Sequence, residues 1–203
     1  MKRIVIHWSA GTSWANDLDR DHYHYLIEGD GTVIEGKRPV SANAGPLVAG
    51  RYAAHTLGCN TGSIGVALCG MAGAVERPFS AGKYPINAVQ LDAAAALVAR
   101  LCAQYGIAVT PETVLTHAEV QPTLGIKQRG KWDIARLPWR PDLIGPKACG
   151  DYIRSRVIAM MALPASVPPP AVETPPDQNP IKSFWAAFVA AVLTIITRKG
   201  PTQ

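Results

Sequence analysis

The proline-rich segment at residues 162–180, ALPASVPPPAVETPPDQNP, sets the strongest limit on how this chain can fold. Proline lacks a backbone N–H and has a fixed φ angle, so this density of prolines excludes a helix or a central strand. Such a segment is typical of an extended, semi-rigid linker. The residues before it, 1–161, are enough for one domain of ordinary size. The sequence therefore predicts a folded domain over 1–161, a linker over 162–180 and a short C-terminal segment.

The C-terminal segment, residues 181–199, reads IKSFWAAFVAAVLTIITRK and carries no charge between Phe184 and Thr197. As a helix, residues 181–197 would span roughly 25 Å, slightly less than the hydrocarbon core of a bilayer, about 30 Å. Basic side chains that could reach the two membrane interfaces flank it: Lys182, Arg198 and Lys199. We expect a hydrophobic helix that crosses or associates with a membrane. The alternative is a core helix docked on the domain, and the linker argues against it.

The composition excludes global disorder and gives a mild hint about partners. The chain is 48% hydrophobic and 17% charged, which is enough apolar material for a packed core. Its net charge of +5 suits an anionic partner, such as nucleic acid, a membrane surface or an anionic cell-wall polymer. No run or helical stripe of Lys and Arg is present, so we expect no nucleic-acid partner.

The N-terminus and the cysteines indicate a reducing compartment. Met1-Lys2-Arg3 leads directly into a short apolar strand, which does not match a signal peptide, so we expect synthesis in the cytoplasm. The four cysteines show no CxxC spacing. We therefore expect them to be reduced and mostly buried.

Hydrophobic periodicity and turn residues predict a mixed α/β fold. The glycines of Gly29-Asp30-Gly31 separate two short apolar runs, which is a hairpin signal. Asn87 and Gly106 can begin and end a helix with a clear apolar stripe. The expected strands are 3–6, 23–27, 32–35, 63–68 and 114–116, and the expected helices are 87–105 and 145–161. This interleaving predicts a mixed central β-sheet flanked by helices.

Two histidines follow apolar strands. His7 comes after Ile4-Val5-Ile6, and His117 comes after Val114-Leu115-Thr116. Functional residues of open α/β sheets gather beyond the carboxyl ends of strands, so the two imidazoles converge if their strands are neighbours. With Asp133 they would make a three-ligand zinc site with a fourth position open to water. The alternative is that both histidines are ordinary polar residues at strand ends.

Five blocks of sequence, in this order, resemble one known family. They are IVIHWSAG (4–11), YHYLIEGDGTVIEG (23–36), AAHTLGCNTGSIGVALCG (53–70), VLTHAEV (114–120) and GKWDI (130–134). Together they resemble the zinc-dependent N-acetylmuramoyl-L-alanine amidases of phage endolysins and bacterial wall hydrolases, which are related to the peptidoglycan recognition proteins. The resemblance covers roughly residues 3–140 and implies the fold of that family.

The resemblance implies roles for individual residues. The zinc ligands of the family fall on His7, His117 and Asp133, with one Zn²⁺ per chain. The family's lysine two residues before the third ligand falls on Lys131 and helps to stabilise an oxyanion. The tyrosine that opens the YHF-like strand falls on Tyr23 and orients water and substrate. From the residues alone, Lys131 could equally be a surface lysine, and Tyr23 could simply pack.

Further positions follow from the same blocks. His55 falls on a histidine that the family often has near its cleft, and we expect His55 and Asn60, in one Gly/Asn-rich loop, to contact substrate. We expect His24 to be structural, and Glu119 to share a strand face with His117 as a possible supporting residue. The chain departs from the family after Asp133, where Ile-Ala-Arg replaces a DPG-like sequence, so the cleft rim should differ.

These features favour an enzyme that cleaves bacterial peptidoglycan between N-acetylmuramic acid and L-alanine. The expected context is a phage endolysin acting on the cell wall in host lysis, with a monomeric catalytic domain and a membrane contact through residues 181–199. One rival is a peptidoglycan-binding module without activity, which we expect to lose a zinc ligand; here all three positions hold competent ligands. The other rival is a membrane-anchored structural protein in which the C-terminal helix is the functional element.

Overall fold

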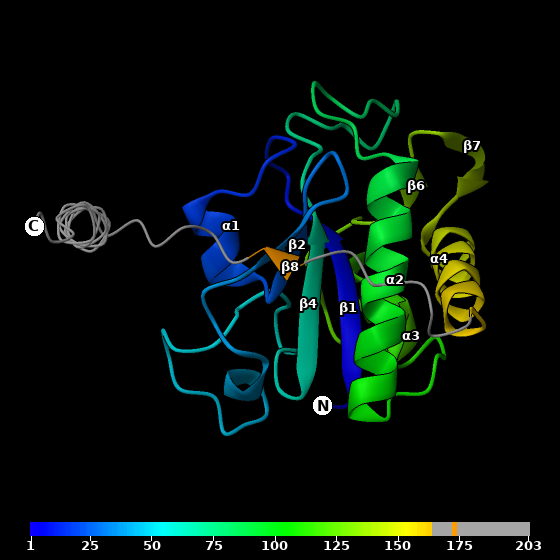
Figure 1. Ribbon diagram of the computed structural model, residues 1–203. Helices are drawn as coiled ribbons and strands as arrows, with labels where there is room; N and C mark the ends of the chain where they lie inside the picture. Colours follow the sequence, from blue (N-terminus) through cyan, green and yellow to red (C-terminus); the bar gives the residue numbers. More distant parts are fainter. Residues whose placement is uncertain (164–171, 174–203) are drawn as a thin grey trace, which may run out of the picture. The chain divides into compact units, whose positions relative to one another are not determined.

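A single mixed sheet organises the domain (Figure 1). The computed structural model describes residues 1–163 and 172–173. The six strands lie in the order β5-β1-β4-β2-β3-β8. Their bounds are β1 Arg3–Trp8, β2 Tyr25–Ile27, β3 Val33–Glu35, β4 Ser63–Leu68, β5 Val114–Thr116 and β8 Val172–Glu173. A separate two-stranded sheet joins β6 (Arg136–Leu137) to β7 (Arg140–Ile144).

The centre of the sheet is parallel. β1 pairs in parallel with β4 on one side and with β5 on the other. β2 also runs parallel to β4, and only the β2–β3 hairpin is antiparallel among the first five strands. All six residues of β4 are buried, as expected for a parallel strand that is covered on both faces. The carboxyl ends of β1 and β5 consequently meet at one edge of the sheet.

The longest helix is fixed to the sheet by polar contacts as well as by its apolar face. The helices are α1 (Asp17–His22), α2 (Ala88–Tyr105), α3 (His117–Leu124) and α4 (Pro146–Met161), with a 3-10 turn η1 at Val40–Asn43. Asn87 and Gln90 form a capping box at the start of α2, and Gly106 ends it at a φ of 63°. The buried amide of Gln90 also donates to the carbonyls of Ile27 and Cys69, at the carboxyl ends of β2 and β4.

Two apolar clusters lie on the sheet. The larger one brings together β1, β4, α2 and α4, and Figure 1 shows α2 and α4 side by side along the sheet. The smaller one contains Val5, Cys59, Leu115 and Val120, with Leu124 and Ile126 packed against it. This smaller cluster supports α3 and the loops beside the carboxyl ends of β1 and β5.

Most predicted elements are confirmed, with one consequential error. The strands, the hairpin, α2 and α4 lie close to their predicted bounds, and the four cysteines are buried and unpaired. The placement of Glu119 on a strand is wrong, because β5 ends at Thr116 and α3 begins at His117. Glu119 accepts a hydrogen bond from the Thr116 N–H, so the sequence T-x-x-E acts here as a helix start. Helix α1 and the β6–β7 pair were not predicted.

The C-terminal predictions fall mainly on other residues. The expected hydrophobic helix at 181–199 lies outside the described residues, as does most of the predicted linker. Within the described part of the chain, no helix is long and apolar enough to span a bilayer. From the linker, residues 172 and 173 form β8, which pairs in parallel with β3.

Candidate active site

Parallel pairing places two histidines at the same edge of the sheet. Ile6 of β1 pairs with Thr116 of β5, and the next residue on each segment is a histidine. His7 is still within β1, while His117 is the first residue of α3. Asp133 lies beside them in the loop before β6. The Ala118 N–H donates to the Asp133 carbonyl at 2.6 Å and holds this loop against the start of α3. The predicted convergence of the three residues is thus present.

Three potential ligand atoms face one another. The Nδ1 atoms of His7 and His117 lie 3.0 Å apart, and the Asp133 Oδ2 lies 3.0 Å from the first and 3.1 Å from the second. All three side chains are buried. Contacts this short need a proton or a cation between the atoms, so the protonation of each ring decides what the site can hold.

The tautomer of His117 follows from its neighbour Gln128. The Gln128 Nε2 lies 2.9 Å from the Leu57 carbonyl and 3.2 Å from the Ile126 carbonyl, and both carbonyls can only accept. The amide is therefore oriented with Oε1 toward His117, 2.8 Å from its Nε2. An amide oxygen can only accept, so the proton of neutral His117 is on Nε2. Its Nδ1 presents a lone pair to Asp133.

A second chain of contacts assigns the proton of His7. The Ser63 carbonyl accepts from His55 Nε2 at 3.5 Å, which leaves His55 Nδ1 as an acceptor. The Thr56 hydroxyl, at 2.8 Å, donates to that Nδ1, and its oxygen lies 3.3 Å from His7 Nε2. His7 Nε2–H is then the donor to Thr56. Like His117, His7 turns an unprotonated Nδ1 toward Asp133.

The resulting group of three acceptors fits a divalent metal. Two imidazole nitrogens and a carboxylate oxygen, without a proton between them, repel one another unless a cation lies among them. Two histidines and one carboxylate are a common zinc ligand set, and ligands of a tetrahedral zinc lie about 3.3 Å apart. The observed separations of 3.0–3.1 Å are close to that value.

The pKa shifts of His7 and Asp133 favour the protonation states that a metal requires. Burial lowers the pKa of His7 to about 4, the positive charge of Lys131 acts in the same direction, and the Asp133 carboxylate opposes them. Burial alone would raise the pKa of Asp133, but the imidazoles of His117 and His7, which would donate to the carboxylate in their protonated forms, outweigh it and hold that pKa below its ordinary value. At neutral pH His7 is therefore neutral and Asp133 is ionised, as metal binding requires.

A cleft of about 430 Å³ opens above these ligands. His117 and Asp133 line it, whereas His7 is fully buried behind them. The rings of Trp8 and Trp132 pack edge to face at 5.0 Å beside the cleft. The lining contains these four other residues predicted for the site: Tyr23, His55, Asn60 and Lys131.

Tyr23 and Lys131 both lie near the three potential ligands. Tyr23 lies at the end of α1 rather than in a strand, and its ring centroid is 5.2 Å from that of His7. Burial and the charge of Asp133 raise the pKa of Tyr23, so its phenol stays protonated at neutral pH. Lys131 is exposed on the cleft rim, and its positive charge reaches His7, whose pKa it helps to lower.

His55 and Asn60 belong to the loop before β4. His55 is buried, with its ring edge-on to His7, and the absence of a side chain at Gly65 leaves room for that ring. The Asn60 side chain accepts from the Thr56 N–H at 2.8 Å and so shapes the loop.

Sequence reasoning missed Thr56 and Gln128, because a lone threonine or glutamine in a loop carries no spacing signal. His24, predicted to be structural, is buried and accepts from the Gly65 N–H.

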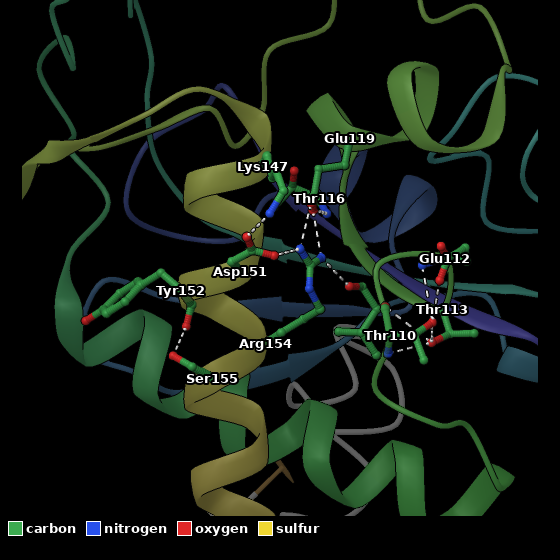
Figure 2. A network of polar contacts seen from close by, with 11 residues as sticks. Thr110, Glu112, Thr113, Thr116, Glu119, Lys147, Asp151, Tyr152, Arg154 and Ser155 are labelled. Carbon is green, nitrogen blue, oxygen red and sulfur yellow. Dashed lines mark hydrogen bonds and ion pairs between the residues drawn. The ribbon is translucent and has the colours of Figure 1, made fainter.

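A buried ion pair supports the His117 segment from behind. Figure 2 shows Arg154 of α4 directed at Glu119 of α3, and both carboxylate oxygens are bound, at 2.9 and 3.1 Å. Arg154 also donates to the Val114 carbonyl of β5. Gly150 allows this contact, since a Cβ there would collide with the Glu119 carboxylate. Arg154 thus ties together the strand and the helix that meet at His117.

Comparison with known proteins gives one family match. A family model described as N-acetylmuramoyl-L-alanine amidase matches residues 1–135. Among solved structures, the chain is similar to the N-acetylmuramoyl-L-alanine amidase LysC from Clostridium intestinale URNW, with 18% identity and a TM-score of 0.45 over 77% of this chain and 85% of that one. It is also similar to a mutant form of PlyL, with 20% identity and a TM-score of 0.46 over 78% of this chain and 85% of that one. No curated protein matches the chain.

Proposed function

The chain belongs to the N-acetylmuramoyl-L-alanine amidase family, and from this premise we propose that it cleaves peptidoglycan between N-acetylmuramic acid and L-alanine with one Zn²⁺. The observation that carries the proposal is the group of three acceptor atoms of His7, His117 and Asp133 below an open cleft. We propose that these side chains would hold the zinc, which substrate and water could reach from the cleft that His117 and Asp133 line. Bound there, zinc would lower the pKa of a water ligand to about 7 and so supply a nucleophile at neutral pH.

The remaining catalytic work falls to two side chains of the cleft. The Lys131 ammonium stabilises the negative charge that develops on the scissile carbonyl oxygen, and this help counts because it is strongest in the transition state. Tyr23, which is kept as a neutral phenol, donates its O–H and orients water and substrate. In the proposal, neither residue binds the metal.

The walls of the cleft bind the substrate. His55 and Asn60 line one side and are proposed to contact the muramyl peptide. Arg129 and Lys131 place positive charge on the rim, which suits the carboxylates of wall peptides. A basic cleft rim of this kind favours peptidoglycan as the substrate over a neutral amide.

We also propose that the protein is an endolysin that acts on the host cell wall during phage lysis. The support is the resemblance of its five sequence blocks to that group of amidases. The uncharged run from Phe184 to Thr197 supports a membrane contact through residues 181–199.

The decisive experiment is mass spectrometry of the products released from purified sacculi by the full chain, with and without a chelator. We expect free stem peptides with L-alanine amino termini, which disappear on chelation and return when zinc is added. A His117→Ala variant should match the chelated protein, while His22→Ala, at the end of α1 and outside the cleft lining, should match the parent.

Three other outcomes would overturn the proposal in different ways. Cuts within the sugar chain or inside the stem peptide would keep an active site but replace the reaction. Binding to sacculi without new termini would establish a binding module. Activity that survives complete removal of divalent metals would exclude the zinc mechanism.

A further inference from the structure

Gln128 is an unusually well-connected side chain in the cleft wall. It is 3% exposed, and both polar atoms of its amide are engaged. Its two N–H donors go to the carbonyls of Leu57 and Ile126, and its backbone N–H goes to the side chain of Gln121. The cleft has no other buried amide side chain among its lining residues.

These contacts leave only one role for the remaining atom. Because the N–H donors are already committed to two carbonyls, the amide cannot flip, and its oxygen must face His117 Nε2 at 2.8 Å. An acceptor there stabilises the proton on Nε2 and keeps it off Nδ1. Nδ1 is the atom that lies 3.1 Å from the Asp133 carboxylate.

We propose that Gln128 is a positioning residue that fixes the tautomer and ring orientation of His117 and thereby sets the affinity of the site for zinc. The inference rests on the proposed metal site but adds a residue that the ligand set does not contain. Partners of this kind behind a metal-binding histidine typically change metal affinity by about 10- to 100-fold when they are removed.

A purely structural role for Gln128 makes a different prediction. The side chain also ties the loop at Leu57 to the loop at Ile126, so its loss could loosen the cleft wall without acting on His117. Gln128→Leu removes the acceptor and the donors. Gln128→Glu keeps an oxygen toward His117 but removes both donors. In the Glu variant the second carboxylate oxygen would face the two carbonyls, so it should loosen the loops at least as much as Gln128→Leu does. Tighter zinc binding by the Glu variant would therefore report on the acceptor and not on the loops.

The test measures zinc affinity of the full chain by competition with a chromophoric chelator. We expect Gln128→Leu to bind zinc about 10- to 100-fold more weakly than the parent, and Gln128→Glu to stay close to the parent. Gln121→Leu is the matched control, because it removes the contact to the Gln128 backbone and leaves the contact to His117 in place. It should bind zinc like the parent.

A second readout observes the proton itself. In zinc-loaded protein with ¹⁵N-labelled histidine, the parent and Gln128→Glu should show a slowly exchanging His117 Nε2–H signal, which Gln128→Leu should lose. The inference is overturned if the Leu and Glu variants weaken zinc binding equally, or if the parent shows no protected Nε2–H. The second criterion still applies if Gln128→Leu does not fold. A parent that binds no zinc would instead refute the proposed metal site itself.

Discussion

At the scale of single residues, the contacts behind the proposed ligands matter to the site as much as the proposed ligands themselves. His7 and His117 present the same nitrogen to the same carboxylate, but their supports differ. A side-chain amide holds His117 at 2.8 Å, whereas the hydroxyl behind His7 lies at 3.3 Å and is itself held by His55. The shorter contact is the one to His117, which lines the cleft. Water in the cleft could otherwise form hydrogen bonds with this ring.

Lys131 is the residue for which a specific catalytic prediction can be made. It lines the cleft, and no carboxylate within residues 1–163 pairs with its ammonium. Its positive charge helps to lower the pKa of His7. We expect Lys131→Met to lower kcat by about 100- to 1000-fold, the usual cost of losing one oxyanion donor, with little change in zinc content. Release of stem peptides from sacculi and zinc analysis of the purified variant measure the two quantities.

The matched control for this prediction is Lys127→Met. Lys127 is an exposed lysine in the same loop, but it does not line the cleft. It should keep full activity. Equal losses of activity in the two variants would refute the oxyanion contact at Lys131. They would mean that positive charge acts in general, by binding the anionic wall.

At the scale of elements, the junction between β5 and α3 positions His117, and contacts from α4 stabilise this junction. The Arg154 guanidinium donates to Glu119, Asp151 and the carbonyl of Val114. The arginine side chain itself is almost completely buried. Removing one partner of a buried ion pair leaves the other charge buried and uncompensated, which destabilises the fold. The orientation of His117 therefore depends on a helix that begins some distance later in the chain.

This dependence predicts a large stability effect at Arg154. Arg154→Met would leave the Glu119 carboxylate buried without its cation, and we expect the free energy of unfolding to fall by about 3–5 kcal/mol. Arg156→Met on the same helix is the control, because its pair with Asp92 is partly exposed and should contribute at most about 1 kcal/mol. Urea denaturation of both variants without metal measures the two losses. Similar losses would show that the buried pair has no special role.

The same junction shows what could be predicted from sequence. Apolar runs ending in histidine predicted that His7 and His117 converge if their strands are neighbours, and β1 and β5 are indeed parallel neighbours. The helix that starts at His117 was missed, since it is short and contains Pro122, although its T-x-x-E start was readable. The contacts of Gln128 and Arg154 could not be predicted, because they join residues far apart in sequence and follow no local period.

At the scale of the whole molecule, the support of the proposed site extends beyond the part of the chain that matches the family model. The family match ends at residue 135, just after the third proposed ligand. Helix α4, at Pro146–Met161, lies beyond that limit yet provides Arg154 and packs against α2 and β5. A chain shortened to the matched region would therefore keep every proposed ligand and lose the ion pair behind His117.

The remaining part of the chain gives a prediction about where the enzyme acts. Residues 181–199 combine an uncharged apolar run with basic residues at both ends, a composition that favours a lipid interface. We expect the full chain to co-sediment with vesicles made from bacterial lipids, and a chain ending at Glu173 to stay in the supernatant while still releasing stem peptides from sacculi. Equal sedimentation of the two proteins would refute the membrane contact, because the domain alone would then account for binding. A shortened chain that neither sediments nor cleaves would show that the amidase domain also needs the C-terminal segment for its activity.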